Sequence, residues 1–371
     1  MYYLSGVAID AGGNLYIADP NNHHIRKLSP EGVLSTIAGN GTFAYSGDGG
    51  PATDTQFDHA SGVALDAAGA VYVADFNFLG GRVRKISPDG TITTVAGSGV
   101  APYSAPNGDG GQATSAVVFP TAVVVDSLGN LYIAEGFDIR KVGPDGVIST
   151  FQNIPASNLA FGPDGGLYVS ARTVSEIPPT GTLAPVAGNG FFYPTCYPAS
   201  GNFGFGACPP LPTPPPLGDG GPATQATIFP AGMAVDSANN LYIADVQGRI
   251  REVVYSTGVI TTIAAGQLKT PMAVAFDAAG NLYIADYIAY RVQKVSTDGA
   301  ITTIAGNGSY GHSGDGGLAA EAQLLGPTGL VVDADGNVYV SDVDSIRLLK
   351  PVTADTPVAA ESTTRRPEEA R

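Results

Sequence analysis

The chain has 371 residues, of which 44% are hydrophobic and only 14% are charged, so it can bury a large core. Its formal net charge of −15, from 33 acidic and 18 basic side chains, repels phosphate backbones and argues against a nucleic-acid partner. No apolar run reaches the length of a membrane-spanning helix.

The N-terminal residues, MYYLSGVAID, do not show a basic segment followed by an apolar one, so no signal peptide is visible. The chain begins almost inside a repeated unit, which indicates a trimmed, mature or incomplete product. The 50 glycines and 28 prolines favour tight turns over long helices.

One unit is repeated along the chain, and the repetition dominates the sequence. The first copy reads GVAIDAGGNLYIAD (residues 6–19), HIRKLSPEG (24–32) and VLSTIAGNG (33–41). The second copy begins with GVALDAAGAVYVAD at residue 62. The seven units start near residues 5, 61, 121, 157, 231, 272 and 328.

The turn motifs that recur within each unit predict four short antiparallel strands. A D-x-x-G-N turn joins the first two strands, and an S-P-D-G type turn joins the last two. The second strand, Leu-Tyr-Ile-Ala in most units, is apolar on both faces and is therefore covered on both sides. Small sheets stacked around an axis provide that cover, so the sequence predicts an all-β fold, a β-propeller.

The unit resembles the NHL repeat, a propeller-forming family, through GVAxDxxGNLYIAD and the I/V-R-K strand that follows it. The resemblance covers residue 5 to about residue 350, so residues 1–350 are expected to form one propeller. Seven blades are favoured by the repeat count, and six, common in this family, is the alternative. The seventh unit stops at residue 350, and residues 357–360 are a candidate for its missing outer strand within the segment 351–371, whose charged tail is expected to be disordered.

An acidic residue ends the second strand in six units, and an Arg lies in or beside the third strand of the same units. We expect these pairs to be scaffold contacts, because catalytic sites break the symmetry of a repeat. The Tyr of every second strand is assigned to the interblade core for the same reason. The acidic residues are Asp19, Asp75, Glu135, Asp245, Asp286 and Asp342, and the arginines are Arg26, Arg84, Arg140, Arg251, Arg291 and Arg347.

Four crossovers between units carry a G-D-G-G motif, with the carboxylates Asp48, Asp109, Asp219 and Asp315. As a phosphate loop the motif lacks a Lys, and as a calcium loop it supplies only one carboxylate. We expect an Asp that caps the following N–H groups, with divalent-cation binding as the alternative. The residues after the motif predict a short helical cap whose apolar residue, Phe57, Phe119, Phe229 or Leu324 with Leu325, packs on the blades.

The binding face is predicted where the crossovers and the loops between strands two and three meet. Its candidate residues are the four motif carboxylates, the six strand-end acids, His59 and His312. The two short crossovers, 153–157 and 266–271, make the rim of this face uneven. A two-histidine metal site formed by His59 and His312 is the minor alternative to two solvated side chains.

Cys196 and Cys208 lie in one Pro- and Gly-rich insertion, which predicts a loop-closing disulfide or, alternatively, two unpaired thiols. A disulfide implies an oxidising compartment, so the expected location is secreted or periplasmic.

No G-x-S-x-G, H-E-x-x-H or P-loop motif occurs. Some NHL-type lyases hold zinc with several histidines. Related propeller lactonases and streptogramin lyases use active-site sets of polar residues that differ from blade to blade, and the sequence does not single out such a set. We predict a monomeric, non-catalytic scaffold without a cofactor that binds a protein, a small molecule or a carbohydrate. The alternative is an enzyme of the lactonase or lyase type with a divalent metal at the channel mouth.

Overall fold

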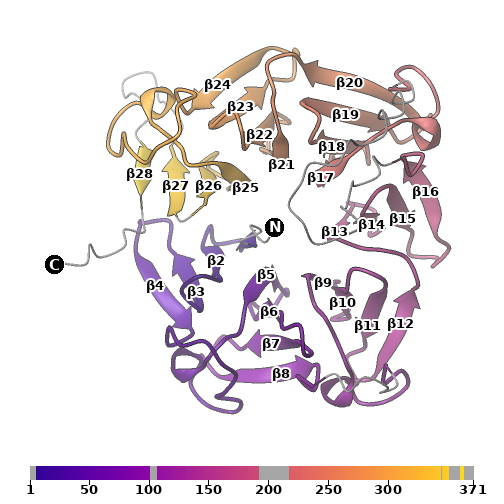
Figure 1. Ribbon diagram of the computed structural model, residues 1–371, viewed down its shortest axis with the longest axis vertical. Helices are drawn as coiled ribbons and strands as arrows, with labels where there is room; N and C mark the ends of the chain where they lie inside the picture. Colours follow the sequence, from indigo (N-terminus) through magenta and orange to yellow (C-terminus); the bar gives the residue numbers. More distant parts are fainter. Residues whose placement is uncertain (1–5, 101–106, 192–216, 344, 351–359, 363–371) are drawn as a thin grey trace, which may run out of the picture.

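The structure is a computed structural model that describes residues 6–100, 107–191, 217–343, 345–350 and 360–362. Seven four-stranded antiparallel sheets stand as blades around a central axis (Figure 1). In each blade the strands follow one another from the axis outward, in the order of the chain. The all-β propeller is confirmed, with seven blades rather than six.

The strands are short and recur at regular spacing. Blade 1 contains β1 (Val7–Ile9), β2 (Leu15–Asp19), β3 (His24–Leu28) and β4 (Leu34–Ala38). Blade 2 contains β5 (Ala60–Leu65), β6 (Val71–Asp75), β7 (Arg82–Ile86) and β8 (Ile92–Ala96). Blade 3 contains β9 (Ala122–Val125), β10 (Leu131–Ala134), β11 (Ile139–Val142) and β12 (Ile148–Gln152). Blade 4 contains β13 (Asn158–Phe161), β14 (Leu167–Ser170), β15 (Val174–Ile177) and β16 (Ala184–Ala187).

The last three blades follow the same plan. Blade 5 contains β17 (Pro230–Val235), β18 (Leu241–Asp245), β19 (Arg249–Val254) and β20 (Val259–Ala265). Blade 6 contains β21 (Pro271–Phe276), β22 (Leu282–Asp286), β23 (Arg291–Val295) and β24 (Ile301–Ala305). Blade 7 contains β25 (Pro327–Val332), β26 (Val338–Asp342), β27 (Ser345–Leu349) and β28 (Ala360–Ser362).

The turn between the first two strands is held by its Asp and by the Tyr of the second strand. Asp10 accepts hydrogen bonds from the N–H groups of Gly12 and Asn14, and from the Tyr16 hydroxyl at 3.1 Å. The Tyr16 ring packs in a cluster with Val63 and Val71 of the next blade, as predicted for an interblade residue. Five other blades repeat the Tyr–Asp bond, through Asp66, Asp126, Asp236, Asp277 and Asp333.

The four crossovers with a G-D-G-G motif lie at the outer circumference, between the outer strands of consecutive blades (Figure 1). In the first of them the N–H groups of Gly49 and Ala52 donate to the carbonyls of Ile92 and Gly90, at and just before β8. The motif therefore covers an outer edge that would otherwise present unpaired backbone groups.

Each of these crossovers contains a 3₁₀ helix of three residues, which confirms the predicted caps: η1 (Ala52–Asp54), η2 (Ala113–Ser115), η3 (Ala223–Gln225) and η4 (Ala319–Glu321). The buried apolar residue lies nine positions after the motif Asp in all four, as Phe57, Val118, Ile228 and Leu324. The prediction was correct for Phe57 and Leu324 but wrong by one residue for Phe119 and Phe229, which are only half-buried.

The ring closes without exchange of strands between its first and last blades. All four strands of blade 7 come from the C-terminal part of the chain, and β28 pairs with β27 at Ala360 and Glu361. Of the predicted closing strand only Ala360 lies among the described residues. Side chains join the two blades instead, in a cluster that includes Leu15, Ile17, Tyr339, Ile346 and Leu348.

No helix in the described ranges is long and apolar enough to cross a membrane. Cys196 and Cys208 lie in the segment 192–216, outside the described residues, so the disulfide stays a prediction.

Candidate functional site

The propeller has two faces that differ in what they present. The crossover face carries the loops between the second and third strands and the ends of the fourth strands. The turn face carries the D-x-x-G-N and S-P-D-G type turns. The predicted site residues belong to the crossover face and to the circumference beside it.

The acids that end the second strands are mostly buried anchors for the crossovers. Asp75 accepts the N–H groups of Asp58 and His59 at 2.9 and 2.8 Å, where the crossover enters β5. Asp286 and Asp342 hold the entries to β21 and β25 in the same way. Asp75, Asp245, Asp286 and Asp342 are at most 2% exposed.

Burial dominates the pKa of four of the strand-end carboxyls. Desolvation raises the pKa of Asp75 to about 7, against the opposing effects of the His59 N–H group and the Arg84 charge. Desolvation raises the pKa of Glu135 to about 8, against the charge of Arg140. The pKa values of Asp245 and Asp342 are also raised by burial. These groups stabilise the loops and are not arranged as surface ligands.

The motif carboxylates are bound by the arginines of the third strands. Asp48 lies 2.8 Å from Arg84, and Asp109 lies 2.6 Å from Arg140. Asp219 lies 2.8 Å from Arg251, and Asp315 lies 2.7 Å from Arg347. We call these four pairs the Asp–Arg clasps. Each fixes a crossover to the blade that follows it.

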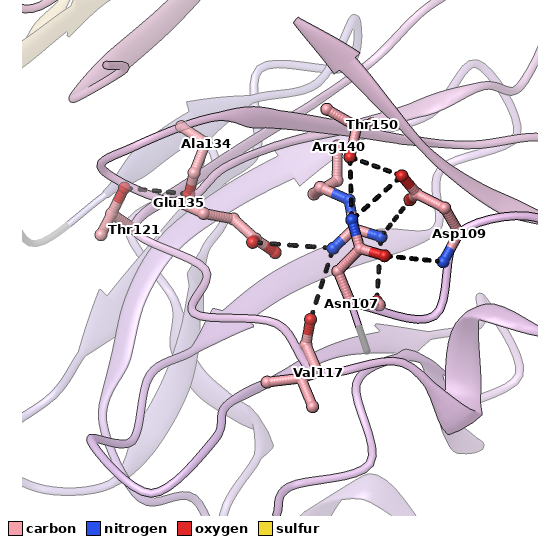
Figure 2. Close-up of polar contacts among 8 residues, drawn as sticks. All are labelled: Asn107, Asp109, Val117, Thr121, Ala134, Glu135, Arg140 and Thr150. Carbon is pink, nitrogen blue, oxygen red and sulfur yellow. Dashed lines mark hydrogen bonds and ion pairs between the residues drawn. The ribbon is translucent and has the colours of Figure 1, made fainter. Parts of the chain in front are cut away.

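Figure 2 shows the clasp of blade 3 in detail. Arg140, whose side chain is 1% exposed, donates to Asp109, to the carbonyls of Asn107 and Val117, and lies 3.9 Å from Glu135. The Thr150 hydroxyl donates to the other Asp109 oxygen at 2.6 Å. Burial acts to raise the pKa of Asp109, but Thr150 and Arg140 outweigh it, so the pKa lies below its ordinary value.

The clasp differs from the predicted N–H cap. The hydrogen bonds of the Asp48 and Asp109 side chains go to Arg, Tyr, Thr and Asn side chains, and none comes from the N–H groups that follow the motif in the described residues. The clasp uses the charge of a buried guanidinium, which makes a stronger hydrogen bond than a neutral N–H group.

The third strand contains Arg at this position wherever a G-D-G-G motif precedes the blade. Blades 4 and 6 lack the motif and carry Ser175 and Gln293 at the same register. The predicted Arg291 is not equivalent, because it pairs with Asp286 at the end of the strand. Blade 1 keeps an equivalent Arg26, whose nearest described acid is Asp19 at 3.8 Å. This correlation was visible in the sequence, but it requires the strand register to be recognised.

The structure does not bring His59 and His312 together as a pair. Burial lowers the pKa of His59, and the second contribution comes from His23 of blade 1 rather than from His312. His312 is exposed and acts electrostatically on Asp342 of blade 7. No cluster of three His, Cys, Asp or Glu side chains suited to a metal occurs within the described part of the chain.

The sequence reasoning missed three exposed apolar side chains on the crossover face. Phe78 and Leu79, in the loop between β6 and β7, are 70% and 76% exposed. Phe137, in the loop between β10 and β11 of the neighbouring blade, is 88% exposed. These loops differ between blades, so the repeat pattern gives no signal for them. We call Phe78, Leu79 and Phe137 the apolar tips.

Comparison with known proteins gives relatives of the same repeat and fold. The sequence profile of the NHL repeat matches residues 1–28. Teneurin-4 of Mus musculus is 27% identical over 389 residues, which cover 93% of this chain and 12% of the teneurin. Teneurin-3 of Mus musculus is 32% identical over 166 residues, which cover 40% of this chain and 6% of the teneurin. The chain thus spans about an eighth of the length of the curated relatives it matches.

Solved propellers match nearly the whole chain at low sequence identity. The virginiamycin B lyase of Staphylococcus aureus superposes with a TM-score of 0.59 and 15% identity, over 94% of both chains. The extracellular domain of the hybrid two-component system BT4673 of B. thetaiotaomicron has a TM-score of 0.56 and 13% identity, over 94% of this chain and 38% of that one. These likenesses show the fold alone. The NHL profile and the teneurin similarity support an NHL-repeat β-propeller, and the structure gives it seven blades.

Proposed function

We propose that this propeller is a scaffold that binds a protein partner on the crossover face of blades 2 and 3. The observation that carries the proposal is the exposure of the apolar tips on loops of neighbouring blades. Single exposed apolar residues are ordinary on protein surfaces, but large ones gathered on adjacent loops are typical of an interface.

The loop of blade 2 is held in place, which supports binding with little loss of conformational entropy. The Leu79 N–H group donates to Asn77 at 2.7 Å, and the Gly81 N–H group donates to the Val118 carbonyl at 2.8 Å. The Phe78 ring lies edge-on to the Phe76 ring at 5.0 Å. Phe78 and Leu79 are therefore presented from a fixed backbone.

The alternative enzyme needs several polar side chains from different blades at the channel mouth. The seven inner strands read VAI, ASGVAL, AVVV, NLAF, PAGMAV, PMAVAF and PTGLVV, without a titratable side chain. This lining favours the scaffold. A location outside the cytoplasm is part of the proposal, supported by Cys196 and Cys208 and by the similarity to an extracellular domain.

A photo-crosslinking residue placed at position 137 tests the proposal, with position 128 as its matched control. Leu128 is 78% exposed and lies on the turn face, so it reports contacts that are not specific to the proposed face. In extracts and secreted fractions of the source cells, we expect a distinct crosslinked protein at position 137 and not at position 128. The same products at both positions, or none at 137, would contradict the proposal.

A further inference from the structure

Between neighbouring blades, on the turn face, the second-strand Tyr of one blade meets the first turn of the next. Between blades 2 and 3 these elements enclose a cavity of about 470 Å³, lined in part by Asp66, Tyr72, Lys85, Gln112 and Gly129. We call this cavity, and the corresponding position between other blades, the interblade hollow. Each pair of consecutive blades has the same strands at this place, but the side chains differ.

In four blades a Lys of the third strand brings a positive charge to the hollow. Its ammonium lies over the Tyr ring, as at Lys85 and Tyr72, 5.1 Å from the ring centroid. Lys85 also lies 3.5 Å from the turn carboxylate Asp66, and Lys294 lies 3.8 Å from Asp277. Lys27 and Lys141 lie over their Tyr rings in the same way. In blades 2 and 6 the chain's own cation therefore pairs with the turn carboxylate.

Blades 4 and 5 reverse this charge. Glu176 takes the Lys position opposite Tyr168, and Glu252 takes it opposite Tyr242. Glu252 accepts the Tyr242 hydroxyl at 2.9 Å, and Asp236 lies 3.3 Å from the same hydroxyl. None of the acids Asp164, Glu176, Asp236 and Glu252 forms an ion pair with a described residue.

Blade 4 also lacks the turn carboxylate, because Gly162 stands where the other blades have Asp. The Tyr168 side chain is fully buried, and its hydroxyl has no hydrogen-bond partner. Desolvation raises the pKa of Tyr168, and the nearby charges of Glu176 and Asp164 raise it further. A buried, unpartnered hydroxyl beside two acids is a costly arrangement unless something else binds there.

The side chains around Gly162 and Gly166 converge. A Cβ atom at Gly162 would lie 3.0 Å from Asp164 Oδ1 and 3.5 Å from Asn239 Oδ1. A Cβ atom at Gly166 would lie 2.5 Å from Glu176 Oε1 and 3.2 Å from the same Asp164 oxygen. Asn239 Oδ1 is buried without a partner, and Asn239 holds a φ of 63° where the other blades have Gly. The carboxylate oxygens of Asp164 and Glu176 and the amide oxygen of Asn239 therefore gather around two residues that have no side chain, next to the ring of Tyr168.

The geometry points to a site for a hard divalent cation at the corresponding place between blades 4 and 5, where these oxygens gather, with calcium preferred over magnesium. Its ligands are Asp164, Glu176, Tyr168 and Asn239. All donors are oxygens, two carboxylates balance a double charge, and water completes the shell. Calcium accepts such an irregular shell, whereas magnesium demands a near-octahedral one. With two carboxylates, we expect a Kd on the order of 10⁻⁴ to 10⁻³ M.

Terbium luminescence tests the site directly, because terbium replaces calcium and nearby tyrosines sensitise it. The chain has no Trp, so the tyrosine signal is not masked. The wild-type protein should give a luminescence that calcium displaces, and calcium should raise its melting temperature more than magnesium does. No displaceable signal in the wild type would overturn the proposal.

Glu176→Lys restores the residue type of blades 1, 2, 3 and 6, so it should fold while losing at least about tenfold in calcium affinity. Glu31→Lys makes the same charge change on an exposed turn and should leave the affinity unchanged. Asn239→Gly removes one ligand and relieves the positive φ, so it should weaken binding without loss of stability even if the Lys variant misfolds. Asp109→Asn removes a carboxylate of a G-D-G-G loop, so it tests whether calcium binds at these loops instead. This variant should bind calcium as tightly as the wild type does. Unchanged affinity in both hollow variants would contradict the assignment.

Discussion

At the residue scale, the clasp explains why a motif with one carboxylate recurs at four crossovers. Arg84, Arg140, Arg251 and Arg347 are fully buried in the blades, and each needs a counter-charge. A buried charge without a partner is far more costly than a neutral side chain in the same place. The G-D-G-G loop supplies the carboxylate from the circumference.

Asp109→Asn should lower the free energy of unfolding by about 2 kcal/mol, because Arg140 is then left with Glu135 at 3.9 Å and with neutral acceptors. The double variant Asp109→Asn/Arg140→Gln copies Gln293 of blade 6 and should recover much of this loss. Urea unfolding of both single variants and the double variant gives the coupling between the two positions. Additive losses would show that the pair is not coupled, and Asp145→Asn on an exposed turn should have little effect.

The buried carboxyl Asp75 predicts a pH dependence. Because its pKa is raised in the folded state, the folded protein binds more protons than the unfolded one between pH 4 and pH 7. Asp75 therefore destabilises the protein as pH rises through this range. Burial lowers the pKa values of His24 and His59, which gives the opposite slope near pH 6.5, so the effect of Asp75 must be isolated.

Asp75→Asn keeps an oxygen that accepts the N–H groups of Asp58 and His59 but removes the titration. The difference in melting temperature, variant minus wild type, should increase from pH 5 to pH 8. A difference that does not depend on pH would show that the pKa of Asp75 is not raised in the folded protein.

At the element scale, the sequence predicts strands, turns and caps well because each depends on local residue pattern. The D-x-x-G-N turns and the doubly apolar second strands are the clearest cases. Which residue of each crossover is buried was not predictable in the same way, because the three-residue 3₁₀ helix is followed by extended chain. In extended chain a shift of one residue turns a side chain to the other face, and this explains the error at Phe119 and Phe229.

Ile228→Ala tests that register against its neighbour Phe229→Ala. Ile228 is 2% exposed beneath η3, so its truncation should lower the free energy of unfolding by about 3 kcal/mol. Phe229 is half-buried, so its truncation to Ala should lower the free energy of unfolding clearly less, although its side chain is larger. Chemical denaturation gives the free energy of unfolding of both variants, and a greater loss for Phe229→Ala than for Ile228→Ala would contradict the observed register.

At the scale of the whole molecule, the repeat count predicts the seven blades, but symmetry hides what is particular to each blade. The apolar tips lie on loops whose sequences vary, and the oxygen groups near Gly162 arise from three local departures from the repeat. Neither could be located without the interblade contacts. The positions where the pattern fails are the ones at which we propose binding.

The central claim is that the apolar tips form the partner interface. Its most direct test is the affinity of the protein crosslinked through position 137, measured with purified components by biolayer interferometry. Replacing Phe78, Leu79 and Phe137 together by Ser should weaken binding at least about tenfold, because anchors of this kind carry most of the energy of an interface. Leu128→Ser should leave the affinity unchanged. Equal affinity of the triple variant and the wild type would contradict the account.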